Sequence, residues 1–113
     1  SKIYEFNEEY LDVFQALTSS APAIVALIIE SLSDGGLSGG LQKQLSDELV
    51  IEMMLGTILL LRDFNTSTAE LKNMVTSPAG TTISALRVLE KRSFRSALIE
   101  SIIAATKRSK EFS

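Results

Sequence analysis

Apolar residues recur at helical spacing along most of the chain. The first such pattern covers residues 8–17, and its apolar side chains fall on one face of a helix. Those side chains belong to Phe6, Tyr10, Val13, Phe14 and Leu17. Asn7 is a candidate N-cap, because its side chain can accept a hydrogen bond from an unpaired backbone N–H. The pattern predicts a helix that covers a core on one side only.

The second pattern is apolar on every face. Residues 18–22 are expected to interrupt the first helix, and Pro22 suits the start of the next, where a missing N–H costs nothing. Residues 23–29 then contain no polar side chain. We expect the glycine pairs 35–36 and 39–40 to end this helix. About twelve residues are too few to span a membrane, which takes about 20, so no membrane partner is expected.

A long helix is predicted from about Leu41 to about Arg62. Its second half, residues 53–61, also loses its polar face. A helix that is apolar all round must be buried all round, and a small chain rarely encloses two such helices. The pattern therefore predicts burial against a second copy of the chain, in a homodimer.

Three shorter helices complete the pattern beyond residue 66. Ser67 stands three residues before Glu70, which is the spacing of a capping box. Ser93 is a candidate cap for the last helix. The inner face of that helix is expected to hold Phe94, Leu98, Ile102 and Ala105. The chain is therefore expected to be one all-α domain over residues 1–113, a helical bundle of about six helices.

The connection at residues 75–82 reads Val-Thr-Ser-Pro-Ala-Gly-Thr-Thr. Pro78 and Gly80 exclude a continuous helix, and either Thr81 or Thr82 is a candidate N-cap for the helix that follows. Unpaired N–H groups and the positive end of the helix dipole make such a start a natural anion site. A carboxylate would suit it as a ligand.

Composition narrows the possible functions. Eleven Lys and Arg residues stand against fourteen Asp and Glu residues, which gives a net charge of -3. This balance argues against a nucleic-acid surface. The absence of cysteine excludes disulfides and thiolate chemistry. No apolar stretch of signal-peptide length opens the chain, so a cytoplasmic location is expected.

Metal and nucleotide motifs are not found in the sequence. Asp47, Glu48 and Glu52 crowd one predicted helix, but a carboxylate-bridged metal site in a bundle also uses histidine, and the chain has none. No metal site is therefore expected. No Gly-x-Gly-x-x-Gly sequence follows a strand pattern, so no dinucleotide site is expected in this chain.

A resemblance to a known family rests on three stretches. Residues 71–90, centred on the 75–82 connection, resemble the signature of pyrroline-5-carboxylate reductases. Residues 94–100 and 104–111 resemble the last helix of that family, and residues 33–37 resemble its turn between two long helices. The resemblance implies the C-terminal dimerisation and substrate-binding domain, without the N-terminal Rossmann domain. It implies an intertwined homodimer, similar to the C-terminal part of 6-phosphogluconate dehydrogenases, and possible higher oligomers.

The resemblance also implies a reaction and a site. The expected reaction is reduction of 1-pyrroline-5-carboxylate to L-proline in proline biosynthesis. NADPH or NADH would be bound mainly by the missing N-terminal domain, and this chain alone is not expected to be active. The implied substrate contacts are Ser77, Gly80, Thr81 and Thr82. Thr82 is the catalytic candidate, next to the ring nitrogen.

The chain departs from the family pattern at two places. The usual Gly-Ser-Gly-Pro-Ala and aromatic residue are replaced by Ser-Ser-Ala-Pro-Ala-Ile at residues 19–24, and the usual Gly-Gly after Ser-Pro is Ala79-Gly80. Losing glycine removes backbone freedom. A second hypothesis therefore stands beside the first: a catalytically silent, reductase-like paralogue that serves as a dimerisation or interaction module.

Overall fold

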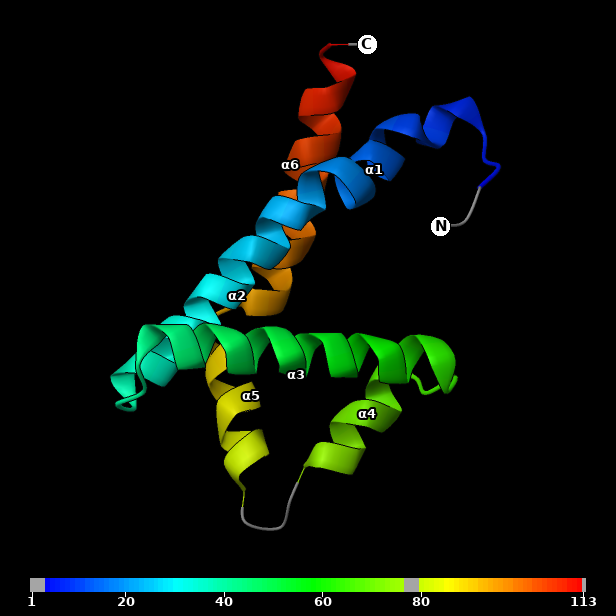
Figure 1. Cartoon of the computed structure of the whole chain (residues 1–113). Coiled ribbons are helices and arrows are strands. Elements are labelled where there is room, and N and C mark those ends of the chain that lie inside the picture. Colours follow the sequence, from blue (N-terminus) through cyan, green and yellow to red (C-terminus); the bar gives the residue numbers. More distant parts are fainter. Residues whose placement is uncertain (1–3, 77–79, 113) are drawn as a thin grey trace.

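The structure is a computed structural model that describes residues 4–76 and 80–112. All regular secondary structure in these residues is helical (Figure 1), which confirms the all-α prediction. The described residues form a 3-10 turn, Glu8–Tyr10, a π-helical turn, Ala16–Ser20, and the α-helices α1 Leu11–Gln15, α2 Ala21–Ser38, α3 Lys43–Asp63, α4 Thr68–Val75, α5 Thr81–Lys91 and α6 Phe94–Lys110.

The first helices form one continuous segment, Glu8–Ser38, of 31 residues. The predicted interruption at residues 18–22 is wrong, because the π-helical turn carries the chain into α2. Within it the Ala21 N–H bonds to the Ala16 carbonyl, five residues back. The wider turn accommodates Pro22, which lies in the first turn of α2 as predicted. The described chain thus has five separate helical segments rather than about six.

The end of α2 is also later than the glycine pattern predicts. Gly35 and Gly36 lie inside the helix, and only Gly39 and Gly40 end it. Gly40 has a φ of 100°, a left-handed conformation that glycine adopts readily. Gly36 remains helical because it lies where α2 meets α3, against Ser46. The predicted start and end of the next helix differ from α3 by only one or two residues.

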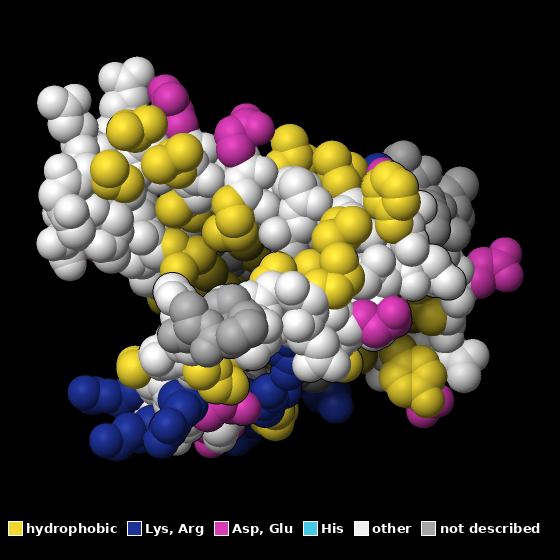
Figure 2. Space-filling view, turned by 90° about the horizontal axis from the view of Figure 1, so that it is seen from below, with side chains coloured by type: hydrophobic (Ala, Val, Ile, Leu, Met, Phe, Trp, Pro, Cys, Tyr) yellow, Lys and Arg dark blue, Asp and Glu magenta, His cyan; other side chains and the backbone are white. Residues whose placement is uncertain are grey.

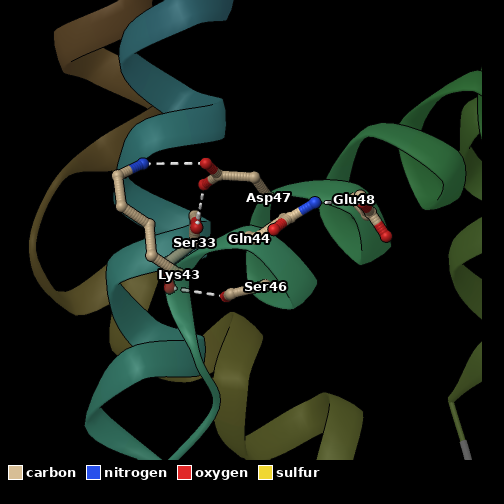
Figure 3. Close-up of polar contacts among 6 residues, drawn as sticks. All are labelled: Ser33, Lys43, Gln44, Ser46, Asp47 and Glu48. Carbon is tan, nitrogen blue, oxygen red and sulfur yellow. Dashed lines mark hydrogen bonds and ion pairs between the residues drawn. The ribbon is translucent and has the colours of Figure 1, made fainter.

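Polar contacts join α2 to α3 (Figure 3). The Ser46 hydroxyl donates to the Ser33 carbonyl at 2.7 Å, and the Ser33 hydroxyl donates to a carboxylate oxygen of Asp47. Lys43 donates to the other oxygen of that carboxylate at 2.7 Å. Hydrogen bonds from Lys43 and Ser33 hold the pKa of Asp47 below its ordinary value. These contacts fix the crossing of the two longest α-helices.

A second link joins the two ends of the chain. α1 and the π-helical turn pack against α6. The Ser109 hydroxyl donates to a carboxylate oxygen of Asp12 at 2.7 Å, across 97 residues of sequence. Phe6 and Phe14 stack nearby with ring centroids 4.5 Å apart. The N-terminal segment is therefore held on the last helix.

The predicted helix caps differ in outcome. The capping box is confirmed, since the Glu70 N–H bonds to the Ser67 hydroxyl at 3.1 Å and the Glu70 carboxylate accepts from the Ser67 N–H at 3.2 Å. Asn7 and Ser93 stand at cap positions, but neither side chain makes a cap hydrogen bond. Asn7 instead accepts the Tyr10 N–H on its backbone carbonyl. Ser93 has a φ of 61° that turns the chain between α5 and α6.

The chain buries little of itself. Among the described residues only Ala16, Ser33 and Ser46 are buried. The radius of gyration is 16.7 Å, whereas a compact chain of this length has about 13 Å. The accessible surface is 9215 Å², against about 6100 Å² for a folded monomer of this mass. About 3000 Å² more surface is exposed than a self-contained domain would leave.

Exposed apolar side chains occur on α2, α3 and α6 alike, including Leu27, Leu55 and Ile103. The inner face predicted for the last helix is confirmed, since Phe94, Leu98, Ile102 and Ala105 are half-buried while Ile99 and Ile103 are exposed. The segment Glu8–Ser38 is also long and apolar enough to cross a membrane. The length argument against a membrane therefore does not hold, although a soluble core helix meets the same criterion.

Candidate functional site

The candidate site lies where α4 ends and α5 begins. The two helices diverge from this connection on one side of α3, as the arms of a V (Figure 1). Its described residues are Val75, Thr76, Gly80, Thr81 and Thr82. Ser77, the remaining predicted substrate contact, lies outside the described residues together with Pro78 and Ala79.

Gly80 stands at the N-cap position of α5. Its φ of 80° and ψ of 6° place it in the left-handed region, which explains a glycine at this point. The prediction that Thr81 or Thr82 caps the helix is wrong, because both are already in its first turn. The Gly80 carbonyl accepts the first helical bond, from the Ser84 N–H at 2.9 Å. Gly80 therefore sets the direction of α5.

The two threonine hydroxyls on either side of the connection are both engaged. Thr82 Oγ1 donates to the Val75 carbonyl at 2.8 Å, and Thr76 Oγ1 donates to the Lys72 carbonyl at 2.6 Å. Carbonyl groups in the last turn of a helix have no helical donor. The Thr82 hydroxyl satisfies such a carbonyl at Val75, whereas the Lys72 carbonyl also accepts the Thr76 backbone N–H at 3.1 Å.

The electrostatics of the site favour an anion. The backbone N–H groups of Thr81, Thr82 and Ile83 have no acceptor within α5, because they precede its first helical bond. They carry the positive end of the helix dipole. Thr81 is exposed, and Gly80 and Thr82 are half-buried, so a small ligand can reach them. Backbone N–H groups in this arrangement suit a carboxylate or phosphate.

The same stretch offers no acid or base. Residues 75–76 and 80–84 contain no titratable side chain. The site can bind and orient a ligand, but its described side chains do not supply a proton at neutral pH. Any redox chemistry would need a bound cofactor to provide it.

Two of the three acidic residues considered for metal binding have other partners. Asp47 accepts from Ser33 and Lys43, and Glu48 accepts from Gln44 at 3.4 Å (Figure 3). No group of three or more metal-ligating side chains occurs within residues 4–76 and 80–112. The crowding of Asp47, Glu48 and Glu52 thus yields a polar surface.

Sequence reasoning missed two apolar hollows, although the all-round apolar pattern of α2 is the signal for one. A hollow of about 520 Å³ opens between α2 and the α5–α6 pair, and one of about 300 Å³ lies among α4, α5 and α6. Neither is lined by residues 80–82. Figure 2 shows hydrophobic side chains exposed over much of the face seen from below. The hollows belong to an uncovered core rather than to the anion site.

Comparisons with known proteins give a consistent result. Residues 8–112 match the family described as pyrroline-5-carboxylate reductase dimerisation. The chain is 43% identical to pyrroline-5-carboxylate reductase of a Synechocystis species and 38% identical to that of Thermus thermophilus, over 96% of this chain and 41% of each relative. It is 41% identical to the soybean (Glycine max) protein over 99% of this chain and 41% of that relative.

Solved structures agree with the sequence relatives. The chain superposes on pyrroline carboxylate reductase of Plasmodium falciparum, solved with NADP bound, with a TM-score of 0.92 and 35% identity. That match covers 96% of this chain and 43% of the other. The Streptococcus pyogenes enzyme gives the same TM-score at 29% identity, over 96% and 42%. The chain thus spans about two fifths of the length of the relatives it matches.

Proposed function

The chain belongs to the pyrroline-5-carboxylate reductase dimerisation family, and from this premise we propose that it is the dimerisation and substrate-binding part of such a reductase. The full enzyme reduces 1-pyrroline-5-carboxylate to L-proline with NAD(P)H, in the cytoplasm, as a step of proline biosynthesis. The observation that carries the proposal is the family match over residues 8–112, together with 43% identity to a reductase of that name.

The nicotinamide cofactor is assigned to the part of the protein outside this chain. The relative from Plasmodium falciparum binds NADP, and this chain covers 43% of it. A Rossmann site needs a parallel sheet and a glycine-rich turn, whereas the described residues form helices throughout their regular structure. NADPH or NADH would therefore be held mainly by an N-terminal Rossmann domain.

Dimerisation is inferred from the apolar surface that a single chain leaves uncovered. The uncovered surface of about 3000 Å² per chain is of the size that obligate interfaces bury. It includes apolar side chains on α2 and α3, which one chain leaves exposed. A second copy of the chain, with its helices intertwined, covers these faces and removes the apolar patch that would otherwise favour a membrane. Assembly of dimers into higher oligomers is compatible with this arrangement.

The connection between α4 and α5 is assigned to the substrate. The carboxylate of pyrroline-5-carboxylate would lie at the start of α5, on N–H groups near Gly80, Thr81 and Thr82, with Ser77 as a further contact. Thr82 would lie next to the ring nitrogen. Hydride transfer from the cofactor to the imine carbon then needs orientation from this chain. Thr82 acts as an orienting group, since no titratable side chain lies in residues 75–76 and 80–84.

The alternative of a catalytically silent paralogue drew on the changed residues 19–24. The two glycines of that motif correspond to Ser19, which lies within the π-helical turn, and to Ala21, which has φ and ψ of -60° and -26°. The Ala21 angles are ordinary right-handed helical values that any residue adopts. The replacement of glycine therefore causes no backbone strain at Ala21, and no described residue favours the silent paralogue. The other replaced glycine, at Ala79, lies outside the described residues.

The deciding experiment is a reductase assay of the full-length protein that carries residues 1–113. Pyrroline-5-carboxylate is supplied with NADPH or NADH, and proline formation is measured. Turnover with either cofactor is expected. A folded, dimeric full-length protein that neither forms proline nor binds it would contradict the proposal and favour the interaction module.

A further inference from the structure

The Thr82 hydroxyl makes an unusual hydrogen bond for this chain. Several hydroxyls bond to the carbonyl four residues earlier in their own helix, such as Thr57 to Met53 and Thr106 to Ile102. Thr82 instead reaches the Val75 carbonyl, seven residues back and in a different helix. Apart from the Ser46–Ser33 bond, it is the one hydroxyl-to-carbonyl bond that joins two α-helices among the contacts of the described residues.

This bond ties together two helices that otherwise diverge. α4 and α5 separate from their connection (Figure 1), and within the described residues no other hydrogen bond or ion pair joins them. The Val75 carbonyl is in the last turn of α4, where it has no helical donor. The Thr82 hydroxyl, from the first turn of α5, therefore satisfies this carbonyl. The hydrogen bond, 2.8 Å from Thr82 Oγ1 to the Val75 carbonyl oxygen, fixes the start of α5 relative to the end of α4.

We propose that Thr82 is a positioning residue for the carboxylate site as well as a neighbour of the ring nitrogen. Its bond to Val75 holds the first turn of α5 so that the N–H groups of residues 81–83 keep the direction that a carboxylate needs. This inference rests on the proposed function, because it assigns a second role to a residue of that same site. It goes beyond a nitrogen contact, because it concerns the opposite end of the substrate.

The two roles of Thr82 predict different ligand dependence. A contact with the ring nitrogen affects only ligands that have a ring nitrogen. A positioning role affects every ring carboxylate, because all of them use the same N–H groups. Cyclopentanecarboxylate separates the roles, since it keeps the five-membered ring and the carboxylate of proline but has no nitrogen.

The experiment measures dissociation constants of proline and cyclopentanecarboxylate for the full-length protein by calorimetry. Thr82→Val keeps the shape of the side chain and removes the hydroxyl. It is expected to weaken cyclopentanecarboxylate binding about tenfold, a change of about 1.4 kcal/mol. Thr82→Ser restores the hydroxyl and is expected to bind both ligands within about twofold of wild type. Thr106→Val, which loses a hydroxyl bond inside α6, is the matched control and is expected to bind like wild type.

The outcomes are distinct. If Thr82→Val weakens proline but leaves cyclopentanecarboxylate unchanged, Thr82 only contacts nitrogen and the inference is wrong. Thr82→Ala carries the same expectation as Thr82→Val, so one poorly folded variant does not decide the matter. If both variants bind cyclopentanecarboxylate as wild type does, positioning is excluded. If wild-type protein neither binds proline nor forms it, the proposed function fails first, and the inference fails with it.

Discussion

The Ser46 hydroxyl donates a 2.7 Å hydrogen bond to the Ser33 carbonyl, and these two serines are, with Ala16, the buried residues of the described chain. Small side chains let α2 and α3 approach closely, and the hydrogen bond offsets the cost of burying the Ser46 hydroxyl. No buried side-chain polar atom in residues 4–76 and 80–112 lacks a partner. This crossing is thus fixed within one chain, whereas the apolar faces around it would be covered only by a second copy of the chain.

Gly36→Ala should destabilise the protein. A Cβ at Gly36 would lie 2.1 Å from Ser46 Oγ and 3.2 Å from its Cβ, and the hydroxyl cannot move without losing its bond to Ser33. Overpacking of this kind costs about 1–3 kcal/mol. Gly35→Ala is the matched control, because nothing lies within 4 Å of its added Cβ, and alanine favours a helix by up to about 1 kcal/mol. Urea unfolding at fixed protein concentration measures the change in free energy of unfolding for both variants. Equal changes for Gly36→Ala and Gly35→Ala would contradict the close crossing of α2 and α3.

Ser67→Ala should loosen α4. It removes the side-chain acceptor of the Glu70 N–H in the capping box, and loss of such a cap costs about 1 kcal/mol. The expected result is faster hydrogen exchange of the Glu70 amide and a lower free energy of unfolding. Thr68→Ala, at the exposed neighbouring position, is the control and should change stability by less than about 0.5 kcal/mol. If Ser67→Ala lowers the free energy of unfolding no more than Thr68→Ala does, the capping box does not stabilise α4.

Asp47→Asn should change the acid sensitivity of the fold. Hydrogen bonds from Lys43 and then Ser33 lower the pKa of Asp47 from 3.8. Because the folded pKa lies below the unfolded one, ionised Asp47 stabilises the protein above about pH 4, and this contribution is lost as pH falls through the lowered pKa. Wild type should exceed Asp47→Asn in free energy of unfolding at pH 6, and the difference should shrink as pH falls below about 4.

The control for that titration is Glu52→Gln, on the same helix and exposed. It exchanges a carboxylate for an amide without removing any hydrogen bond found among the described residues. Urea unfolding across the same pH range should show no comparable loss of difference. A difference between wild type and Asp47→Asn that stays constant from pH 6 to pH 2 would mean that Asp47 ionisation does not stabilise the α2–α3 crossing.

Leu27→Arg should weaken self-association. Leu27 is 62% exposed in one chain and lines the hollow between α2 and the α5–α6 pair. Placing a charge on a face that a second copy covers should cost at least about 2 kcal/mol, a factor of about thirty in the dimer Kd. Gln44→Arg adds the same charge at an exposed polar position and should leave the Kd unchanged. Analytical ultracentrifugation decides, and a wild-type chain that stays a compact monomer would refute the shared core.

Local signals in the sequence predicted the helices and one cap correctly, whereas a π-helical turn and contacts between elements account for the predictions that were wrong. The Ser67 and Glu70 capping box needs only four consecutive residues. The expected break at residues 18–22 fails because a π-helical turn absorbs Pro22, and Gly36 stays helical because Ser46 crosses it. In the candidate site, the residue types were predictable, but the pairing of Thr82 with Val75 was not, since it depends on how α4 and α5 meet.

By itself the sequence determined an all-α chain, the approximate limits of its long helices, and apolar faces too extensive for one small domain. Periodicity and capping act over a few residues, so they can be read without knowing the fold. Only the tertiary structure decided that Ser33 and Ser46 meet at the crossing of α2 and α3, and that Gly80 rather than a threonine occupies the N-cap position of α5. Such pairings depend on the angle between helices, which no single helix specifies.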